Sequence, residues 1–182
     1  MSNGGWTATT KSCRVVALAE VPYFHLDVPG VAVAKGRPRM TRSGHVYTPE
    51  KTREYEERIR LATRITMAGR KAIKGPCFIH VAVFFEAPAS LSKRARQELF
   101  DGGAWHVKKP DLDNIVKSAI DGITGDDLVI LDDKQIVEVC TFKTYAESSL
   151  LSLDVFEVGA NVDRFAQRWR EWEGQEIAVS PI

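Results

Sequence analysis

The chain has 182 residues, of which 44% are hydrophobic and 27% are charged, as in ordinary globular proteins. This length is enough for one domain with a real core and is short for two. The most apolar run, residues 77–85, is far too short to span a bilayer, and residues 1–20 lack the apolar core of a signal peptide. We therefore expect a cytoplasmic protein with no membrane partner.

The charges are distributed unevenly, although the net charge is only +1. Residues 35–74 hold twelve Lys and Arg against four Asp and Glu, a net of +8, whereas residues 111–163 hold three against twelve, a net of −9. A basic region beside an acidic one fits a surface that grips phosphate around a pocket that holds metal. Solvated helix faces give the same pattern, so charge alone leaves both interpretations open.

The composition divides the chain into three parts. Residues 1–20, rich in Ser, Thr, Gly and Ala, are expected to form a flexible leader. Residues 21–175 form the predicted domain, and residues 176–182 form a short tail. The sequence contains no internal repeat or low-complexity tract.

The predicted domain begins with an alternating segment, residues 23–33, which indicates a strand or hairpin. A basic loop follows at residues 35–44, and its composition favours contact with phosphate over a merely solvated role. The cations of this loop are Lys35, Arg37, Arg39 and Arg42.

The next segments alternate between helix and strand. Thr48 and Pro49 are typical of a helix start, and the helix is expected to reach about Met67. Its predicted buried stripe consists of Tyr55, Ile59, Ala62 and Ile65. Residues 77–86 are apolar on both faces, which predicts a central strand. Residues 92–100 then indicate a short basic helix that could flank DNA, with Lys93, Arg94 and Arg96 as its cations.

An acidic motif follows at residues 111–117. Asp111 and Asp113 stand two apart, and Lys117 comes one helical turn after Asp113. Apolar residues recur at helical spacing from there to Ile123, which predicts a helix beginning near Asp113. Pro110 favours an extended Lys109, so a strand is expected to deliver Asp111 to the start of this helix.

A second acidic pair, Asp132 and Asp133, precedes a strand-like segment at residues 135–144. Clustered carboxylates repel one another, so they stay ionised only when a cation compensates them. Ligands that are oxygen alone, without His or Cys, suit Mg²⁺ or Mn²⁺ and not zinc. Lys117 would add the fixed positive charge that phosphodiester chemistry requires.

The remaining segments complete the fold class. Residues 150–158 alternate as another strand, and Asn161 is expected to cap a final helix with an apolar, Trp-containing stripe. That stripe is more typical of core or oligomer contact than of base stacking. The predicted fold is α+β, a single domain with a mixed sheet of four or five strands and three or four helices.

Together these motifs resemble the RusA family of Holliday-junction resolvases. The resemblance rests on the Asp-x-Asp-Asn-x-x-Lys pattern of residues 111–117 with Asp132 and Asp133 about twenty residues later. The segments 35–39 and 47–55 are similar to the N-terminal part of many phage and prophage members. The resemblance covers roughly residues 22–158, and it implies a bacterial or phage-encoded protein.

The resemblance implies a Mg²⁺-dependent endonuclease, with Mn²⁺ as a possible substitute, that cuts branched DNA as a homodimer. Asp111, Asp113 and Asp133 would hold the metal, and Asp132 is a secondary candidate. Lys117 would stabilise charge on the phosphate, and Lys108 and Lys109 would join the basic loop in binding DNA.

Two rival functions remain open at this point. One keeps the metal site but cuts flaps, forks or single strands. The other is a catalytically silent protein that binds DNA structures. The complete set of acidic residues with Lys117 argues against the silent binder, because binding alone does not need carboxylates beside phosphate.

Overall fold

The computed structural model describes residues 22–101 and 104–158. Its elements in chain order are β1 (Phe24–Pro29), β2 (Arg39–Met40), β3 (Val46–Tyr47), α1 (Glu50–Met67), β4 (Cys77–Glu86), α2 (Lys93–Asp101), α3 (Leu112–Ile123), the 3-10 turn η1 (Asp133–Gln135), β5 (Ile136–Ala146) and β6 (Leu150–Glu157). The predicted leader, tail and terminal helix lie outside the described residues.

The main sheet of the described residues has four strands in the order β1-β6-β4-β5. β4 pairs antiparallel with β6 and parallel with β5, and β1 pairs antiparallel with β6, so the sheet is mixed. β4 has a neighbour on each side, and its residues Val81 and Val83 are fully buried. The central position predicted for this strand is confirmed, because a hydrogen-bonded strand flanks each of its edges.

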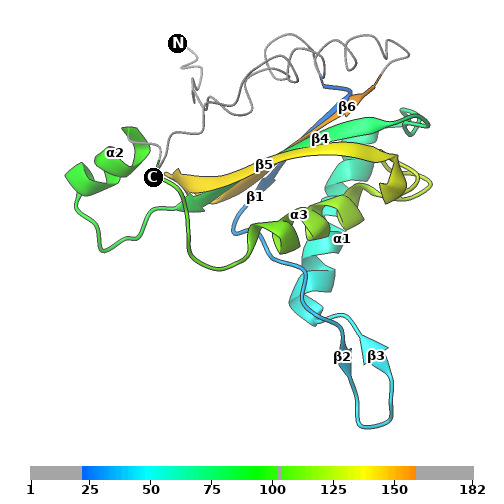
Figure 1. The fold of residues 1–182 in the computed structure, drawn as a ribbon, viewed down its shortest axis with the longest axis horizontal. Coiled ribbons are helices and arrows are strands. Elements are labelled where there is room, and N and C mark those ends of the chain that lie inside the picture. The colour runs from blue at the N-terminus through cyan, green and yellow to red at the C-terminus, as the bar shows by residue number, and fades with distance from the viewer. Residues whose placement is uncertain (1–21, 102–103, 159–182) are drawn as a thin grey trace, which may run out of the picture.

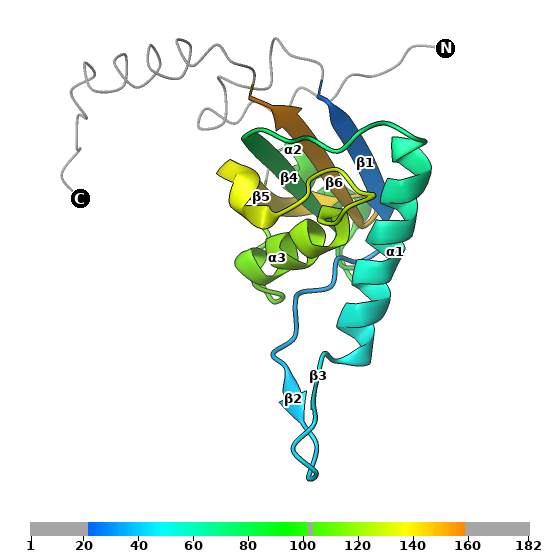
Figure 2. The ribbon, with the colours of Figure 1, turned by 90° about the vertical axis from the view of Figure 1, so that its right-hand side faces the viewer.

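Helices α1 and α3 pack side by side on one face of this sheet (Figures 1 and 2). Gly122 makes this close packing possible, since a Cβ atom there would lie 2.5 Å from Cγ2 of Ile59. The predicted α+β single domain is therefore confirmed, with three helices beside its mixed sheet.

Helix α1 differs from its prediction in the position of its buried stripe. The residues that α1 buries recur every three or four positions: Thr52, Tyr55, Ile59, Thr63 and Met67. Ile65 falls between these positions and is 69% exposed, so the prediction that it is buried was wrong. The stripe instead includes two threonines, because helix geometry and not polarity decided which side chains face α3 and the sheet.

The basic loop also differs from its prediction. Part of it forms the short strand β2, which pairs antiparallel with β3 through Met40 and Val46. Together they make a two-stranded hairpin that extends away from the rest of the molecule (Figures 1 and 2). Within residues 22–101 and 104–158, no helix combines the length and apolarity needed to cross a membrane.

Candidate active site

The first acidic motif occupies the N-terminal end of α3. Asp111 immediately precedes the helix and Asp113 lies in its first turn, and both residues are exposed. The Asp111 carboxylate does not cap the helix, and Asp113 receives only a long 3.4 Å contact from the Asn114 amide. In the described part of the chain neither carboxylate forms an ion pair. Both are therefore available to a ligand, at a helix end that carries partial positive charge.

Lys117 lies one turn beyond Asp113, on the same side of α3. Its side chain is exposed and forms no ion pair with any described residue. The N-terminal end of α3 thus presents two carboxylates and one ammonium group that the fold itself does not use.

The loop before α3 is held by Lys143 of β5. Nζ of Lys143 donates hydrogen bonds to the carbonyl oxygens of Lys108 and Pro110, each at 2.7 Å. The peptide bond between Lys109 and Pro110 is cis, and the segment touches the sheet edge through an isolated bridge from Trp105. The predicted strand into Asp111 is therefore absent here, and a loop tied to β5 delivers this residue instead.

His106 gives the same loop a second anchor. Its ring stacks on Phe85 with 4.0 Å between ring centroids, and its backbone N–H donates to the Lys143 carbonyl at 3.2 Å. Burial, assisted by the positive charge of Lys143, lowers the pKa of His106. The neutral ring therefore packs as an aromatic group, and the loop before Asp111 is fixed at two points.

The second acidic motif forms the turn η1, and its two carboxylates have different roles. Asp132 caps this turn by accepting a hydrogen bond from the Lys134 backbone N–H at 3.0 Å, and its carboxylate pairs with Lys134 Nζ at 2.9 Å. Hydrogen bonds from the Lys134 backbone and side chain lower the pKa of Asp132. Asp133, the first residue of the turn, stays exposed. The turn consequently uses Asp132 as a structural acceptor and presents Asp133 outward.

Gln135 fastens this turn to the segment before β4. Its Oε1 accepts from the backbone N–H groups of Leu131 and Asp132, at 2.8 and 3.0 Å. Its Nε2 donates to the carbonyl oxygens of Ile73 and Gly75, at 2.8 and 2.9 Å. Sequence reasoning missed both Gln135 and Lys143, because their partners lie far away in the chain and carry no recognisable pattern.

The two acidic motifs lie at opposite ends of α3. Pro110 is tied to Lys143 near the end of β5, whereas Ile123 accepts a hydrogen bond from Val129, in the segment that leads to η1 and the start of β5. A helix of twelve residues is about 18 Å long, at about 1.5 Å per residue. Figure 1 shows β5 running back along this length. Accordingly, no three acidic, His or Cys side chains of the described chain form a group that could hold a metal.

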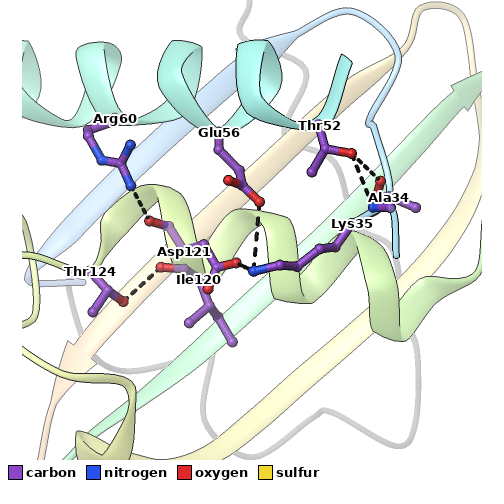
Figure 3. Close-up of polar contacts among 9 residues, drawn as sticks. Ala34, Lys35, Thr52, Glu56, Arg60, Ile120, Asp121 and Thr124 are labelled. Carbon is purple, nitrogen blue, oxygen red and sulfur yellow. Dashed lines mark hydrogen bonds and ion pairs between the residues drawn. The ribbon is translucent and has the colours of Figure 1, made fainter. Parts of the chain in front are cut away.

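The predicted DNA-binding residues fall into two groups. Lys35 is partly buried: its ammonium contacts Asp121 on α3 and lies 3.9 Å from Oε1 of Glu56 on α1 (Figure 3). It joins the base of the hairpin to the helices, and its predicted role in binding DNA stays a prediction. Four of the predicted residues are exposed and form no ion pair with a described residue: Arg37, Arg42, Lys108 and Lys109. Arg39 contributes its backbone to β2.

Comparison with known proteins shows the family of the chain. The family described as endodeoxyribonuclease RusA matches residues 29–155. The chain belongs to the RusA family. A relative named "Uncharacterized protein YqaN", from Bacillus subtilis (strain 168), is 31% identical over 138 residues, which cover 73% of this chain and 95% of that protein. RusA proteins are DNA endonucleases, and the RusA match includes both acidic motifs and the hairpin.

The donor chemistry at the N-terminal end of α3 fits the hard cation that this RusA chain was predicted to use. Asp111 and Asp113 offer only oxygen ligands. Mg²⁺ is usually bound through one or two carboxylates, with waters and phosphate oxygens completing its octahedron. Two carboxylates at one helix end therefore meet that requirement without a third ligand from the same chain.

Proposed function

We propose that the protein is a Mg²⁺-dependent, structure-specific endonuclease that resolves four-way (Holliday) DNA junctions in recombination and repair by symmetric phosphodiester hydrolysis. One observation carries this proposal. A member of an endodeoxyribonuclease family leaves two carboxylates and Lys117 unpaired at one exposed helix end. Groups that folding does not use are candidates for chemistry, since exposed charges contribute little to stability.

The residues have distinct proposed roles. Asp111 and Asp113 hold Mg²⁺, for which Mn²⁺ can substitute, and Asp133 completes the ligand set. When bound, the ion supplies charge that polarises the scissile phosphate and acidifies the attacking water. Lys117 holds its ammonium near the same phosphate and stabilises the charge that develops there. The exposed Lys108 and Lys109, on the loop just before Asp111, hold the flanking DNA.

A homodimer would reconcile these roles with the separation of the two motifs. Asp133 and Asp111 lie at opposite ends of α3, and no group of three possible metal ligands brings them together in the described chain. In a two-fold pair, Asp133 of one copy can lie beside Asp111 of its partner. Two such shared sites also match the two equivalent strands that a four-way junction presents.

Mixing inactive chains tests this arrangement. We expect Asp111→Asn and Asp133→Asn chains to be inactive alone, but active as nicking enzymes after they are unfolded and refolded together. In the mixed dimer, one shared site keeps both native carboxylates. If each site were built from one chain, both sites would stay defective, and the mixture would cut nothing. Sedimentation velocity gives the oligomeric state of each sample.

The substrate is tested with synthetic four-way junction, flap and linear duplex DNA, each with Mg²⁺ and with EDTA. Symmetric cuts in the junction that require Mg²⁺ would support the proposal. Preferential cutting of the flap would instead favour the rival function, a metal-dependent nuclease that cuts flaps, forks or single strands. If the protein binds the junction selectively but cuts no DNA with either Mg²⁺ or Mn²⁺, it is the catalytically silent binder, and the proposed function is contradicted.

A further inference from the structure

The hairpin of β2 and β3 has no assigned role in the chemistry, yet it extends well beyond the body of the protein (Figures 1 and 2). We call residues 37–47 the arm. Its two strands pair only with each other among the described residues. A two-stranded hairpin alone is only marginally stable in water. The arm therefore contributes little to the fold, and its residues are free to serve a partner.

The tip of the arm is nevertheless well defined. The Gly44 N–H donates to the Thr41 carbonyl at 3.0 Å, and the His45 N–H donates to the Thr41 hydroxyl oxygen at 3.1 Å. Gly44 has a φ of +82°, which L side chains rarely adopt. These bonds close a tight turn that places Arg42 and Ser43 at its corner.

One face of the arm is apolar and exposed. Met40 and Val46 are cross-strand partners, so their side chains lie on the same face. They are 70% and 59% exposed. Folding leaves more than half of each side chain exposed, although burying apolar surface is favourable. Such a pair at the end of a projecting ribbon is suited to contact with an apolar surface of a partner.

The charge of the arm shows which kind of partner it fits. From Lys35 to Pro49 the chain contains four Lys and Arg and no Asp or Glu. Arg37 and Arg42 are exposed and have no ion pair among described residues. A cationic surface with an apolar pair fits nucleic acid, which offers phosphates outside and base faces inside. A two-stranded ribbon also has the width that a duplex major groove admits.

The base of the arm is fixed to the catalytic helix. The Lys35 N–H donates to the Asn114 carbonyl in the first turn of α3 at 2.8 Å. The Lys35 ammonium pairs with Asp121 further along α3, and the Gly36 N–H donates to the Thr52 hydroxyl of α1 at 3.1 Å (Figure 3). DNA held by the arm is therefore positioned relative to the end of α3 that carries Asp113.

We propose that the arm enters the branch point of branched DNA, where Met40 and Val46 pack against bases that are no longer fully stacked. Arg37 and Arg42 bind the adjacent phosphates. The inference rests on the proposed function, because it specifies how the same enzyme would distinguish branched from linear DNA. Bases at a branch have already lost part of their stacking, so the apolar pair displaces fewer base contacts there than in a duplex.

Binding in EDTA, where no DNA is cut, tests the arm. The probes are a synthetic four-way junction with 2-aminopurine at the branch and a linear duplex of the same total length. The test variant is Met40→Ser with Val46→Ser. The matched control is Leu61→Ser with Ile65→Ser, which removes an apolar pair of similar exposure from α1. Circular dichroism checks that each variant is folded.

We expect the arm variant to lower junction affinity about 10-fold, as loss of base contacts typically does. Its duplex affinity should change by less than about two-fold, and the 2-aminopurine signal on binding should fall. Replacing Arg37 and Arg42 with Ala should weaken binding to both DNAs and flatten the slope of log affinity against log salt by about one to two units.

Three results would overturn the arm proposal. The first is an arm variant that keeps the same preference for the junction over the duplex. The second is an equal loss of affinity for both DNAs. The third is dissociation of the arm variant into smaller species, which would mean that the arm contacts a second copy of the protein. Cleavage by the unaltered protein separates the two proposals. A protein that binds junctions through its arm but cuts no DNA would contradict only the proposed function. A protein that cuts junctions while the arm variant binds normally would contradict only the arm.

Discussion

The two ends of α3 treat similar acidic residues in opposite ways. At the C-terminal end, the turn that carries Asp132 is closed by a capping box, and Gln135 fastens it with four hydrogen bonds. At the N-terminal end, Asp111 and Asp113 remain exposed, and Lys117 has no ion pair among described residues. One end uses its polar groups to hold its shape, whereas the other is held from outside by Lys143.

This contrast teaches how to separate structural from functional charge in one small protein. A carboxylate that caps a turn has its hydrogen bonds satisfied by folding, so it has little capacity left for an ion or a phosphate. A carboxylate that forms no hydrogen bond or ion pair within the fold keeps its capacity to bind an ion.

The largest effect is expected at Asp111. Asp111→Asn should lower the single-turnover cleavage rate by about 10³-fold or more, because the several kcal/mol of charge stabilisation that a bound ion supplies would be lost. Junction binding in EDTA should stay the same or tighten, since one negative charge is removed. Asp126→Asn, at an exposed Asp of the turn after α3, is the matched control. Full activity of the Asp111 variant would show that this end of α3 is not the active site.

Lys117 should have the next largest effect. Lys117→Ala should reduce turnover by about 10²–10³-fold, because a fixed charge near the phosphate is lost. Lys117→Arg should restore only part of the rate, since a planar guanidinium differs from a compact ammonium. Lys134→Ala, at the other end of α3, removes a Lys that only pairs with Asp132 and should have little effect. Equal rates for the two alanine variants would contradict the contrast.

Gln135 should matter for stability, in contrast to Lys117. Gln135→Ala should lower the free energy of unfolding by about 2–3 kcal/mol, because it leaves part-buried backbone groups of Ile73 and Gly75 without a partner. Asp132→Ala should cost less, because this exposed carboxylate accepts only one backbone hydrogen bond, from Lys134. Urea denaturation with unchanged m-values measures both. A larger loss for Asp132→Ala would mean that the cap, and not Gln135, holds the turn.

The smallest effect concerns Asp154, a carboxylate on the sheet face opposite the helices. Burial raises its pKa, but hydrogen bonds from His80 and His25 outweigh this and lower it. Its contribution to stability is present at neutral pH and is lost as the pH falls through that lowered pKa. Burial lowers the pKa of His25, but Asp154 and Asp27 raise it overall. The His25 contribution is therefore present at acidic pH and is lost as the pH rises through the raised pKa.

Between those two pKa values both charges are present. His25→Gln should then lower the free energy of unfolding by less than about 1 kcal/mol, because solvent screens this half-exposed pair. The difference should shrink at alkaline pH. His45→Gln, at an exposed position of the arm, is the control in urea titrations at several pH values. A cost for His25→Gln that does not vary with pH would show that its ring packing matters and its charge does not.

Much of the candidate site could be predicted from the sequence. The apolar spacing after Asp113 indicated α3, and the helix begins within two residues of the expected position. The doubly apolar run at residues 77–86 indicated the central strand β4. The loop at residues 35–44 was predicted without its hairpin, because strands of two residues leave no periodic pattern. The ion pair between Lys35 and Asp121 could not be predicted, because a sequence does not show that these residues, far apart in the chain, lie within reach of one another.

Local sequence was enough to predict which residues share a turn, because helix and strand periodicity depends on neighbouring positions alone. It therefore predicted that Asp113 and Lys117 lie together at one end of α3. The position of Asp133 relative to Asp111 depends instead on contacts between distant parts of the chain. Lys143 and Gln135 bind backbone groups that lie 33 and 62 positions away in the chain. The parallel pairing of β5 with β4 fixes the direction in which β5 runs from Gln135 to Lys143. Such long-range contacts depend on how the whole sheet assembles, so they place the two acidic motifs at opposite ends of one helix.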